Sequence, residues 1–327
     1  MLFVDNQNIT DPCHNLALEE FLLRHVQIDE PLLLFYINEP SVIIGRNQNT
    51  LEEVDPEYVK ENGIHLVRRL SGGGAVYHDL GNLNFSFITQ GQHDLHNFAR
   101  FTAPVIRVLN TMGLAAELRG RSDIFAAGKK ISGNAQYASR GRMFSHGTIL
   151  FDSNLAELLK AINPRQLQIE SKAVQSIRSH VTNIRELLSQ DMDIATFKQT
   201  LLRGIFATDV IPTYDLSAAE WEQVAQITAE TYNTWEWNIG RSPKFNVQKT
   251  ERYAVGKIDL RIDVEKGRIQ GLKIYGDFAG QKEVTELESF LIGVRYDRSS
   301  LESALADQNL SPYFGVLETE TFLDLLY

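Results

Sequence analysis

The sequence predicts an α+β protein with a large domain, residues 1–246, and a small C-terminal α+β domain, residues 247–327. The chain has 327 residues, of which 43% are hydrophobic, so it is long enough to bury a core in each domain. Strand and helix patterns are interspersed through the large domain. After Trp235-Glu236-Trp237 and Ser242-Pro243, a hairpin pattern precedes two further helices, which sets the domain boundary near residue 247.

The large domain is expected to begin with a helix. Asp11 is a typical N-cap, Pro12 suits the first helical position, and apolar residues between Leu18 and Val26 share one face. Gly63 and Gly113 are expected to end two later helices. The next elements are predicted as strands at Leu32–Ile37 and Val42–Ile44, a helix from 55 to 62, strands at Ile64–Arg68 and Leu83–Ile88, a helix from Phe98 to Met112, and several strands between Leu114 and Phe151, with a turn at Arg140-Gly141.

The rest of the chain is predicted to be helical up to the small domain. A polar connection from Asn163 to Val181 interrupts this region, and a connection of that length is usually functional or mobile. Helices are predicted at 154–162, Ile184–Leu188, Ile194–Phe206 and Ala218–Thr228. In the small domain, the prediction is a hairpin of strands Tyr253–Val264 and Arg268–Tyr275, joined through Glu265-Lys266-Gly267, with helices after Lys282 and Leu301.

Composition and charge exclude several classes of protein. The formal net charge of −10 argues against general affinity for nucleic acid. No apolar run approaches the ~20 residues of a membrane span, and residues 1–6 lack the features of a signal peptide. The single cysteine, Cys13, excludes an intrachain disulfide, and the expected location is the cytoplasm. Between Arg100 and Arg142 there are eight basic residues and two acidic ones, a stretch that suits either a polyphosphate, an acidic partner or a solvated face.

The segment from Arg68 to Asp79 is the most informative motif. Its three consecutive glycines, residues 72–74, have N–H groups that can approach an anion closely and form an anion-binding nest. A glycine triplet alone is more often a flexible loop, but the flanking Arg68-Arg69 and His78-Asp79 pairs favour a phosphate or carboxylate ligand. An alternating strand pattern at Leu83–Phe87 follows, so the site is expected to lie between two strands. Neither the Walker A pattern nor G-x-G-x-x-G fits this chain.

Two more motifs carry polar and small residues, at Gly128–Ala135 and Ser145–Thr148. A zinc site built from His78, His146 and His180 is disfavoured, because no two of these residues have close ligand spacing. A hydrolase triad of Ser71, His78 and Asp79 is also disfavoured, because G-x-S-x-G is absent and sequence neighbours rarely form a triad.

Together these motifs resemble the lipoate-protein ligase A family, and the resemblance spans the chain. It is carried by Asn15–Glu20, Ile43–Asn49, Arg68–Asn82, Lys130–Gly133, His146–Thr148, Ser176–Ser179, Val181–Asn183 and Trp235–Asn238. The resemblance implies a large mixed β-sheet domain flanked by helices, of the biotin/lipoate ligase type related to class II synthetase catalytic domains. The C-terminal segment would be the family's accessory domain.

The resemblance implies a chemistry of two steps. Lipoate and ATP give lipoyl-AMP and pyrophosphate, and the lipoyl group then passes to a specific lysine of an apo lipoyl domain. The first step brings a carboxylate to an anionic α-phosphate, so cations and backbone donors must offset the repulsion. Lys130 is the expected catalytic residue, contacting both the lipoate carboxyl and the α-phosphate. Without the flanking motif, an exposed strand lysine would be the preferred interpretation.

The same resemblance implies two sets of binding residues. Lipoate or lipoyl-AMP would contact Arg69, Ser71, Gly72, Gly73, His78, Asn82, Lys130, Ser132, Gly133 and His146. ATP would contact Arg69, Gly74, Ala75, Val76, Tyr77, Asp123, Lys130, Lys172 and Arg178. We expect His78 to orient the ligand or the backbone rather than to act as a base. Lys172 and Arg178 would close over the adenylate and exclude water.

The expected metal is the Mg²⁺ that accompanies ATP, held by Asp123 through hard carboxylate oxygen. The family usually has Asn before this aspartate, where this chain has Ser122, which leaves the metal contact open. The second step needs no enzyme nucleophile, since the mixed anhydride is already activated and holding the acceptor amine near it suffices. Cys13 is therefore interpreted as a packing residue.

Two alternatives to the ligase stay open. One is a lipoyl or octanoyl transferase that uses preformed lipoyl-AMP or a lipoylated protein as donor. The other is a non-catalytic lipoate or adenylate sensor, for which erosion at Arg69 or Lys130 would be expected, and both residues are intact. The expected partners are lipoate and the lipoyl domains of 2-oxoacid dehydrogenase E2 subunits or the glycine-cleavage H protein. No membrane or nucleic-acid partner is expected, and a monomer is favoured by analogy.

Overall fold

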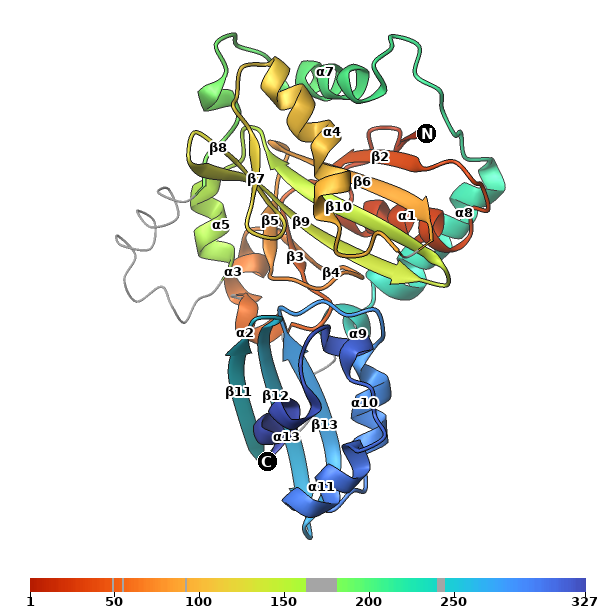
Figure 1. The fold of residues 1–327 in the computed structure, drawn as a ribbon. Coiled ribbons are helices and arrows are strands. Elements are labelled where there is room, and N and C mark those ends of the chain that lie inside the picture. The colour runs from red at the N-terminus through yellow and green to blue at the C-terminus, as the bar shows by residue number, and fades with distance from the viewer. Residues whose placement is uncertain (49, 55, 92, 163–180, 240–244) are drawn as a thin grey trace.

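A seven-stranded mixed sheet forms the centre of the large domain in the computed structural model, which describes residues 1–327 except 49, 55, 92, 163–180 and 240–244 (Figure 1). In sheet order the strands are β1 (Leu2–Asp5), β2 (Leu32–Ile37), β6 (Asn82–Gln90), β10 (Arg142–Leu150), β9 (Lys129–Ser139), β8 (Asp123–Ala126) and β7 (Glu117–Arg119). β1 and β2 run parallel and the other pairs antiparallel. This confirms the predicted mixed sheet.

A second sheet of three strands, in the order β4 (His65–Arg68), β3 (Ser41–Ile44) and β5 (Val76–His78), carries the glycine motif. The motif forms the loop between β4 and β5, as expected for a site between two strands. The sequence-based prediction of the following strand was incomplete. The short β5, which pairs antiparallel with β3, precedes β6 and was not predicted, because three residues are too few to show an alternating pattern.

Helices cover both faces of the large sheet. Period-two alternation along β2 and β6 sends Phe35 and Phe85 to the face packed by helices α4 (Phe98–Thr111) and α7 (Ile194–Phe206). It sends Leu34 to the face packed by α1 (Pro12–Arg24) and α8 (Ala218–Ile227). Asp11 caps α1 as predicted, accepting from the Cys13 and His14 N–H groups. The helices of this domain are α1 (Pro12–Arg24), α2 (Thr50–Glu53), α3 (Pro56–Glu61), α4 (Phe98–Thr111), α5 (Leu155–Ala161), η2 (Arg185–Leu187), α7 (Ile194–Phe206), α8 (Ala218–Ile227), the π-helix η3 (Thr228–Tyr232) and α9 (Trp235–Asn238).

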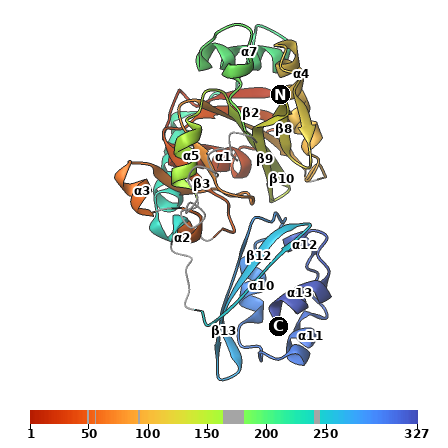
Figure 2. The ribbon, with the colours of Figure 1, turned by 90° about the vertical axis from the view of Figure 1, so that its left-hand side faces the viewer.

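The C-terminal residues form a three-stranded antiparallel sheet with its own apolar core (Figure 2). Its elements are β11 (Val247–Tyr253), β12 (Gly256–Glu265), β13 (Arg268–Gly276), α10 (Val284–Leu291), α11 (Arg298–Leu305), α12 (Ser311–Phe314) and α13 (Thr319–Leu326). The predicted strand Tyr253–Val264 was wrong at its start. Tyr253 ends β11, which pairs with β12 through a turn. The largely polar sequence Gln248–Arg252 hid this edge strand, because little of it is buried.

The small domain contacts the large one beside the glycine loop. Glu283 forms an ion pair with Arg46 and accepts a 3.3 Å hydrogen bond from the Tyr137 hydroxyl. The guanidinium of Arg46 lies 5.3 Å from the centre of the Trp237 ring, within cation–π range. The Gly276 N–H donates to the carbonyl of Asn47. The small domain thus packs against the strand and loop that support the site.

Candidate active site

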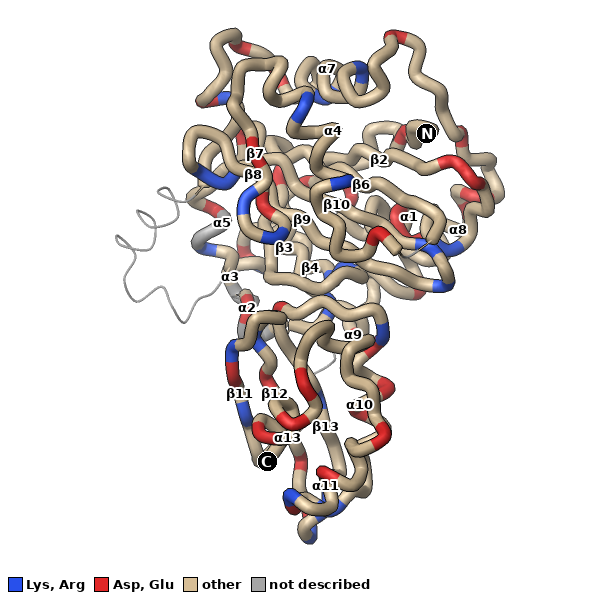
Figure 3. Tube along the Cα trace, in the orientation of Figure 1, with Lys and Arg blue, Asp and Glu red and all other residues tan. Residues whose placement is uncertain are grey.

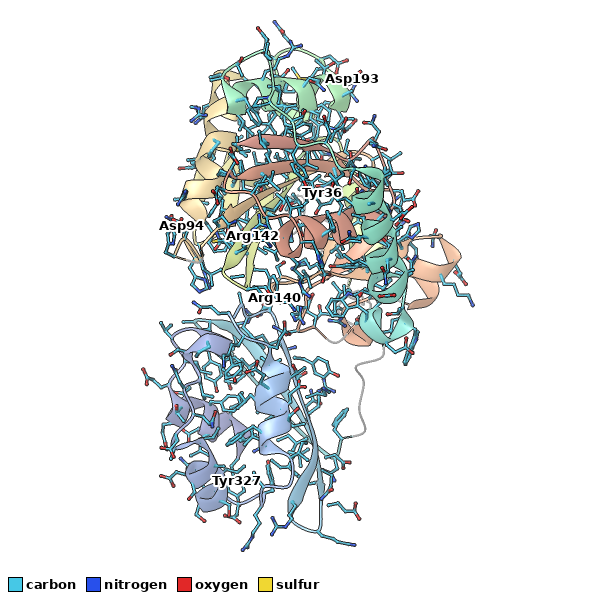
Figure 4. All side chains as sticks on the ribbon, turned by 90° about the vertical axis from the view of Figure 1, so that its right-hand side faces the viewer. Tyr36, Asp94, Arg140, Arg142, Asp193 and Tyr327 are labelled. Carbon is cyan, nitrogen blue, oxygen red and sulfur yellow. The ribbon has the colours of Figure 1, made fainter. Side chains whose placement is uncertain are left out.

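The site is a cavity of about 260 Å³ between α1, the small sheet and strands β6, β9 and β10. Its apolar lining comes from residues including Leu16, Ile43 and Tyr36, and Tyr36 lies inside the large domain beside α1 (Figure 4). Charged side chains line it as well: Arg69, Asp123 and Lys130. A cavity that joins apolar and ionic walls suits an amphipathic acid meeting a phosphate.

The glycine loop contributes backbone to this cavity. Gly73, Gly74, Ala75 and Val76 all line it, and Gly73 has a φ of +92°, which strongly favours glycine. Gly72 does not line it. A Cβ on Gly72 would lie 2.2 Å from the carbonyl oxygen of Phe278, so this glycine is required where the small domain packs on the loop.

Arg69 holds the glycine loop in place through its backbone carbonyls. Its Nη2 donates to the carbonyls of Gly72 at 2.7 Å and Gly74 at 2.8 Å, Nη1 donates to Ile43, and Nε donates to the Ser71 hydroxyl. Burial lowers the pKa of Arg69 to about 10, which still leaves it charged at neutral pH. Arg69 therefore fixes the loop conformation and places a positive charge at the cavity wall.

Arg68, the other member of the arginine pair, has a structural role. Only 1% of it is exposed. Its guanidinium donates to the backbone carbonyls of Gly45, Arg46, Gln48, Trp237 and Asn238 and to the Thr50 hydroxyl. Asp79, from the His-Asp pair, accepts from the backbone N–H groups of Gly81 and Asn154. The flanking residues expected to bind an anion thus include two that order loops instead.

Replacing Arg68 by methionine is expected to lower the free energy of unfolding by about 4 kcal/mol, because several buried carbonyls lose their donor together. Urea denaturation of the whole chain measures this. Arg185→Met is the matched control, since Arg185 is 43% exposed and pairs with Asp152 and Asp191, and its loss should cost under about 1 kcal/mol. Equal losses in the two variants would contradict the structural role of Arg68.

Lys130 and Asp123 form the ionic part of the site. The Lys130 Nζ lies 2.8 Å from the Asp123 carboxylate, and both side chains are about one-third exposed, at 35% and 33%. The register shift between Ile124 and Phe125 in β8 follows Asp123 on that strand and lies opposite the segment Lys130–Ser132 of β9. A Cβ on Gly133 would lie 3.3 Å from Nζ, so the glycine leaves room for the amine. An anionic ligand can therefore reach Nζ by replacing or joining Asp123.

Ser71 and His146 belong to one hydrogen-bonded chain. The Ser71 Oγ lies 2.8 Å from Nε2 of His146, whose Nδ1 lies 3.0 Å from the carboxylate of Glu19 in α1. The order serine, histidine, carboxylate is that of a hydrolase triad. It shares Ser71 with the triad weighed in the sequence, but His146 and Glu19 take the places of His78 and Asp79. Ser71 is fully buried and already accepts from Arg69, so its hydroxyl is not presented to a substrate. This series of hydrogen bonds instead holds Arg69 and the glycine loop in place.

Strand alternation separates the remaining predicted residues. Val76 and His78 line the cavity, whereas the Tyr77 side chain between them packs with Val42 and Ile44 on the opposite face of the small sheet. Tyr77 can therefore offer a ligand only its backbone. Asn82 and Ser132 are buried behind the wall, donating to Asn84 and accepting from Asn134. Lys172, Arg178 and His180 lie outside the described residues.

His78 is buried, and its pKa is lowered to about 3 by burial and by the nearby charges of Arg69 and His146. In the unfolded chain it titrates near 6.5, so the unfolded state binds an extra proton between these values. The free energy of unfolding should fall as the pH drops from about 6.5 toward 3. His78→Gln should show a shallower acid dependence in denaturant titrations. Identical pH profiles would show that His78 is not buried neutral.

The basic stretch is largely committed to local pairs in the structure. Arg119 pairs with Glu117, Arg100 with Asp94, and Arg142 donates to carbonyls at the end of α1. Figure 3 colours Lys and Arg blue and Asp and Glu red along the chain trace. Of the charged residues in the predicted stretch, Lys130 and Asp123 line the cavity. Among the basic residues of this stretch, Lys130 is therefore the one that a ligand in the cavity can contact.

Several residues that line the cavity were not predicted as site residues, and they include its apolar wall. These are Leu16, Tyr36, Ile43, Asn84, Ser122, Asn134, Ala135, Gly147 and Thr148. Leu16, Tyr36 and Ile43 lie in ordinary apolar runs, which signal burial but not which cavity they border. Asn134, Ala135, Gly147 and Thr148 fall within the two motifs of polar and small residues, which were one usable signal. Asn84 and Thr148 are polar positions inside buried strands, which was a second.

Cys13 lies at the start of α1, with its thiol 3.3 Å from the Tyr232 carbonyl. Burial, with a smaller effect of Asp11, raises the pKa of the thiol to about 12. We expect native protein at pH 8 to react slowly with a thiol reagent, and unfolded protein to react at once. The acyl transfer that the family resemblance implies should survive Cys13→Ala. Its loss with intact adenylate formation would instead indicate a thioester route.

The chain matches two family descriptions over consecutive regions. Residues 11–206 match the lipoyl protein ligase A/B catalytic domain, and residues 242–326 match the bacterial lipoate protein ligase C-terminus. No described helix is long and apolar enough to cross a membrane. Fold and cavity together define an acid-activating ligase with a small C-terminal domain, and the chain belongs to the lipoate-protein ligase family.

Relatives and solved structures agree with this assignment. The chain is 54% identical to lipoate-protein ligase LplJ of Bacillus subtilis, with 100% of both covered. The fold is similar to that of P. falciparum LipL1 in complex with lipoate, at a TM-score of 0.80 and 24% identity, with 99% of this chain and 96% of that one covered. A lipoate-protein ligase A bound with ATP has a TM-score of 0.61 and 33% identity, covering 73% and 97%. A bi-partite ligase of Thermoplasma acidophilum, solved with its E2 lipoyl domain, has a TM-score of 0.67 and 32% identity, covering 75% and 98%.

Proposed function

We propose that this protein is an ATP-dependent lipoate-protein ligase that activates lipoate as lipoyl-AMP and transfers the lipoyl group to a lysine of an apo lipoyl domain. The observation that carries the proposal is the single cavity in which the glycine loop, Arg69 and Lys130 adjoin apolar residues of α1, β2 and β3. Binding of lipoate or ATP by relatives supports it.

In the first step, a lipoate carboxylate oxygen attacks the α-phosphorus of ATP, and the bond to pyrophosphate breaks. Lys130 Nζ supplies charge to both reacting anions, and its partner Asp123 keeps the amine in place beforehand. N–H groups of the glycine loop are available for phosphate oxygens, since the loop lines the cavity and Arg69 binds the carbonyls of Gly72 and Gly74.

In the second step, the acceptor lysine amine attacks the acyl carbon of lipoyl-AMP. The bond from carbon to phosphate oxygen breaks, AMP leaves, and the amine loses a proton. The anhydride is already activated, so the protein's task is to hold its carbonyl and to admit the amine. Cys13 is buried against Tyr232 and is not among the residues that line the cavity.

Mg²⁺ would enter with the nucleotide. Asp123 fits this ion, because it offers a partly exposed carboxylate at the cavity and Mg²⁺ in such sites takes one or two carboxylates together with phosphate oxygens. When bound, the ion neutralises phosphate charge. Ser122 also lines the cavity at the position where the family usually has Asn, so Asp123 is the proposed ligand from this chain.

The remaining proposals concern organisation and partners. We propose residues 1–246 as the catalytic domain and 247–327 as the accessory domain, supported by the separate apolar core of the latter. The proposed acceptors are lipoyl domains of 2-oxoacid dehydrogenase E2 subunits and the glycine-cleavage H protein, supported by the ligase solved with an E2 lipoyl domain. A cytoplasmic monomer is proposed from the single cysteine and the family resemblance.

The test is intact-mass analysis of an apo lipoyl domain incubated with the protein, Mg-ATP and lipoate. We expect a lipoyl adduct that requires ATP. Modification from synthetic lipoyl-AMP alone would indicate the transferase. Binding of lipoate without any adduct on several lipoyl domains would indicate the sensor.

A further inference from the structure

One ring nitrogen of His78 has no assigned partner in the cavity wall. His78 lines the cavity and is 3% exposed. Its Nδ1 lies 3.0 Å from the Asn38 side-chain amide, whereas Nε2 is buried and makes no hydrogen bond within the described part of the chain. A buried polar atom left unpaired costs free energy, so such an atom at a cavity wall points to a ligand atom that completes it.

The Asn38 side chain is the last of three buried amides in a row. Asn6 Nδ2 donates to Asn15 Oδ1 at 2.9 Å, Asn15 Nδ2 donates to Asn38 Oδ1 at 2.9 Å, and Asn38 Nδ2 faces His78 Nδ1. At most 1% of each of these asparagines is exposed. Three amides buried to this degree in one line leave little freedom for any of them to rotate.

The direction of the row is set by a backbone carbonyl. A tight turn follows β1, with positive φ at Gln7 and Asn8 and a hydrogen bond from the Ile9 N–H to Asn6. The turn presents the Ile9 carbonyl, which accepts from both Asn6 Nδ2 and Asn15 Nδ2. A carbonyl can only accept, so the NH₂ group of Asn15 must face Ile9.

This orientation propagates to the histidine ring. With its NH₂ toward Ile9 and Asn38, Asn15 turns its oxygen to Asn6, and the oxygen of Asn38 faces Asn15. Asn38 is left to donate to His78, so Nδ1 must be the unprotonated acceptor. In a neutral ring the proton then resides on Nε2.

We infer that Asn6, Asn15 and Asn38 form a relay that positions His78 as a neutral Nε2–H donor toward an oxygen atom of the ligand in this cavity. The relay residues are positioning residues and do not touch the ligand. The inference rests on the proposed function for the identity of that oxygen, which is the lipoate carboxyl oxygen or, after activation, the carbonyl oxygen of lipoyl-AMP.

A neutral donor suits a site that already holds two cations. A charged imidazole beside Arg69 would be disfavoured by repulsion as well as by burial, and both effects lower the pKa of His78. A neutral N–H can still polarise an acyl carbonyl while the proton stays on the ring. The positive charges of Lys130 and Arg69 stabilise the phosphate and the carboxylate, and His78 adds a directional hydrogen bond.

The first test is the ¹⁵N resonances of labelled histidine in the whole protein, without any ligand. We expect His78 in the Nε2–H form at pH 7 and down to about pH 5. Asn38→Asp should move the proton to Nδ1 or charge the ring, because a carboxylate can only accept. Asn110→Asp is the matched control, because the Asn110 side-chain amide, like that of Asn38, both donates and accepts. Its partners are the backbone carbonyl and N–H of Ala116, outside the cavity.

The second test is ligase turnover. Asn38→Asp should lower kcat for lipoyl-AMP formation about 100-fold, with little change in KM for ATP, and Asn110→Asp should leave both unchanged. Glutamine places an amide nitrogen near the position of Nε2 and asparagine near that of Nδ1, so His78→Gln should retain more activity than His78→Asn.

The outcomes separate the relay from the proposed function. An Nδ1–H or charged ring in the wild-type protein overturns the relay whether or not the protein ligates lipoate. An Nε2–H ring with equal, full activity in His78→Asn and His78→Gln overturns the donor role. An Nε2–H ring in a protein without ligase activity leaves the relay standing and removes lipoate as its ligand.

Discussion

Replacing Lys130 by alanine is expected to lower the rate of lipoyl-AMP formation by about 10³-fold while the protein stays folded. The amine lies 2.8 Å from Asp123 at the cavity wall and is about one-third exposed, so its loss leaves no unpaired group in a core. What is lost is the charge that offsets repulsion between carboxylate and phosphate. Pyrophosphate release from lipoate and ATP measures the rate.

Lys129 supplies the matched control for this variant. It precedes Lys130 on β9, so strand alternation turns its side chain to the opposite face, where it lines a separate polar hollow with Ser153 and Glu186. Lys129→Ala should keep wild-type activity. Turnover in Lys130→Ala near that of the wild type, with unchanged secondary structure, would contradict the catalytic assignment.

The second large effect is expected at Arg69. Arg69→Ala removes donors to the carbonyls of Ile43, Gly72 and Gly74 and to the Ser71 hydroxyl in one change. The glycine loop then loses its conformation as well as the nearby charge, so we expect at least a 10²-fold loss of adenylate formation and a destabilisation of about 3 kcal/mol. Turnover assays and urea denaturation measure the two effects.

Two further variants separate geometry from charge. Arg69→Lys keeps the charge but cannot reach four acceptors at fixed angles, so most of the activity should still be lost. Arg142→Lys alters a buried arginine that donates to the Leu22 and Val26 carbonyls away from the cavity, beside α1 (Figure 4), and should affect stability alone. Full activity in Arg69→Lys would show that charge, rather than the fixed loop, is what the site requires.

Local pattern was enough to predict much of the fold. The N-cap at Asp11, the strands around Leu32–Ile37 and the glycine loop between strands all follow from short-range signals that the structure bears out. The edge strand β11 was missed because its side chains are mostly polar, and β5 because it has three residues. Both are stabilised by pairing with strands elsewhere in the chain, which periodicity does not report.

The kind of site was predictable from the sequence, but the hydrogen bonds that connect its residues were not. Glycines and basic residues that lie next to one another in the sequence indicated an anion site. Nothing in the local sequence, however, distinguishes Arg68, which orders loops, from Arg69 at the cavity wall. Glu19 reaches His146 across 127 residues, and Asn38 reaches His78 across 40. Such partners are set by tertiary packing of α1 and the two sheets, so they emerge only from the structure.

Exchange of labelled pyrophosphate into ATP reports adenylate formation without any acceptor protein, and it therefore separates a ligase from a transferase. We expect exchange that requires lipoate in the wild-type protein and in Lys129→Ala, and none in Lys130→Ala. Absence of exchange in a folded wild-type protein that still transfers lipoyl groups from lipoyl-AMP would contradict this expectation, and would identify the protein as a transferase.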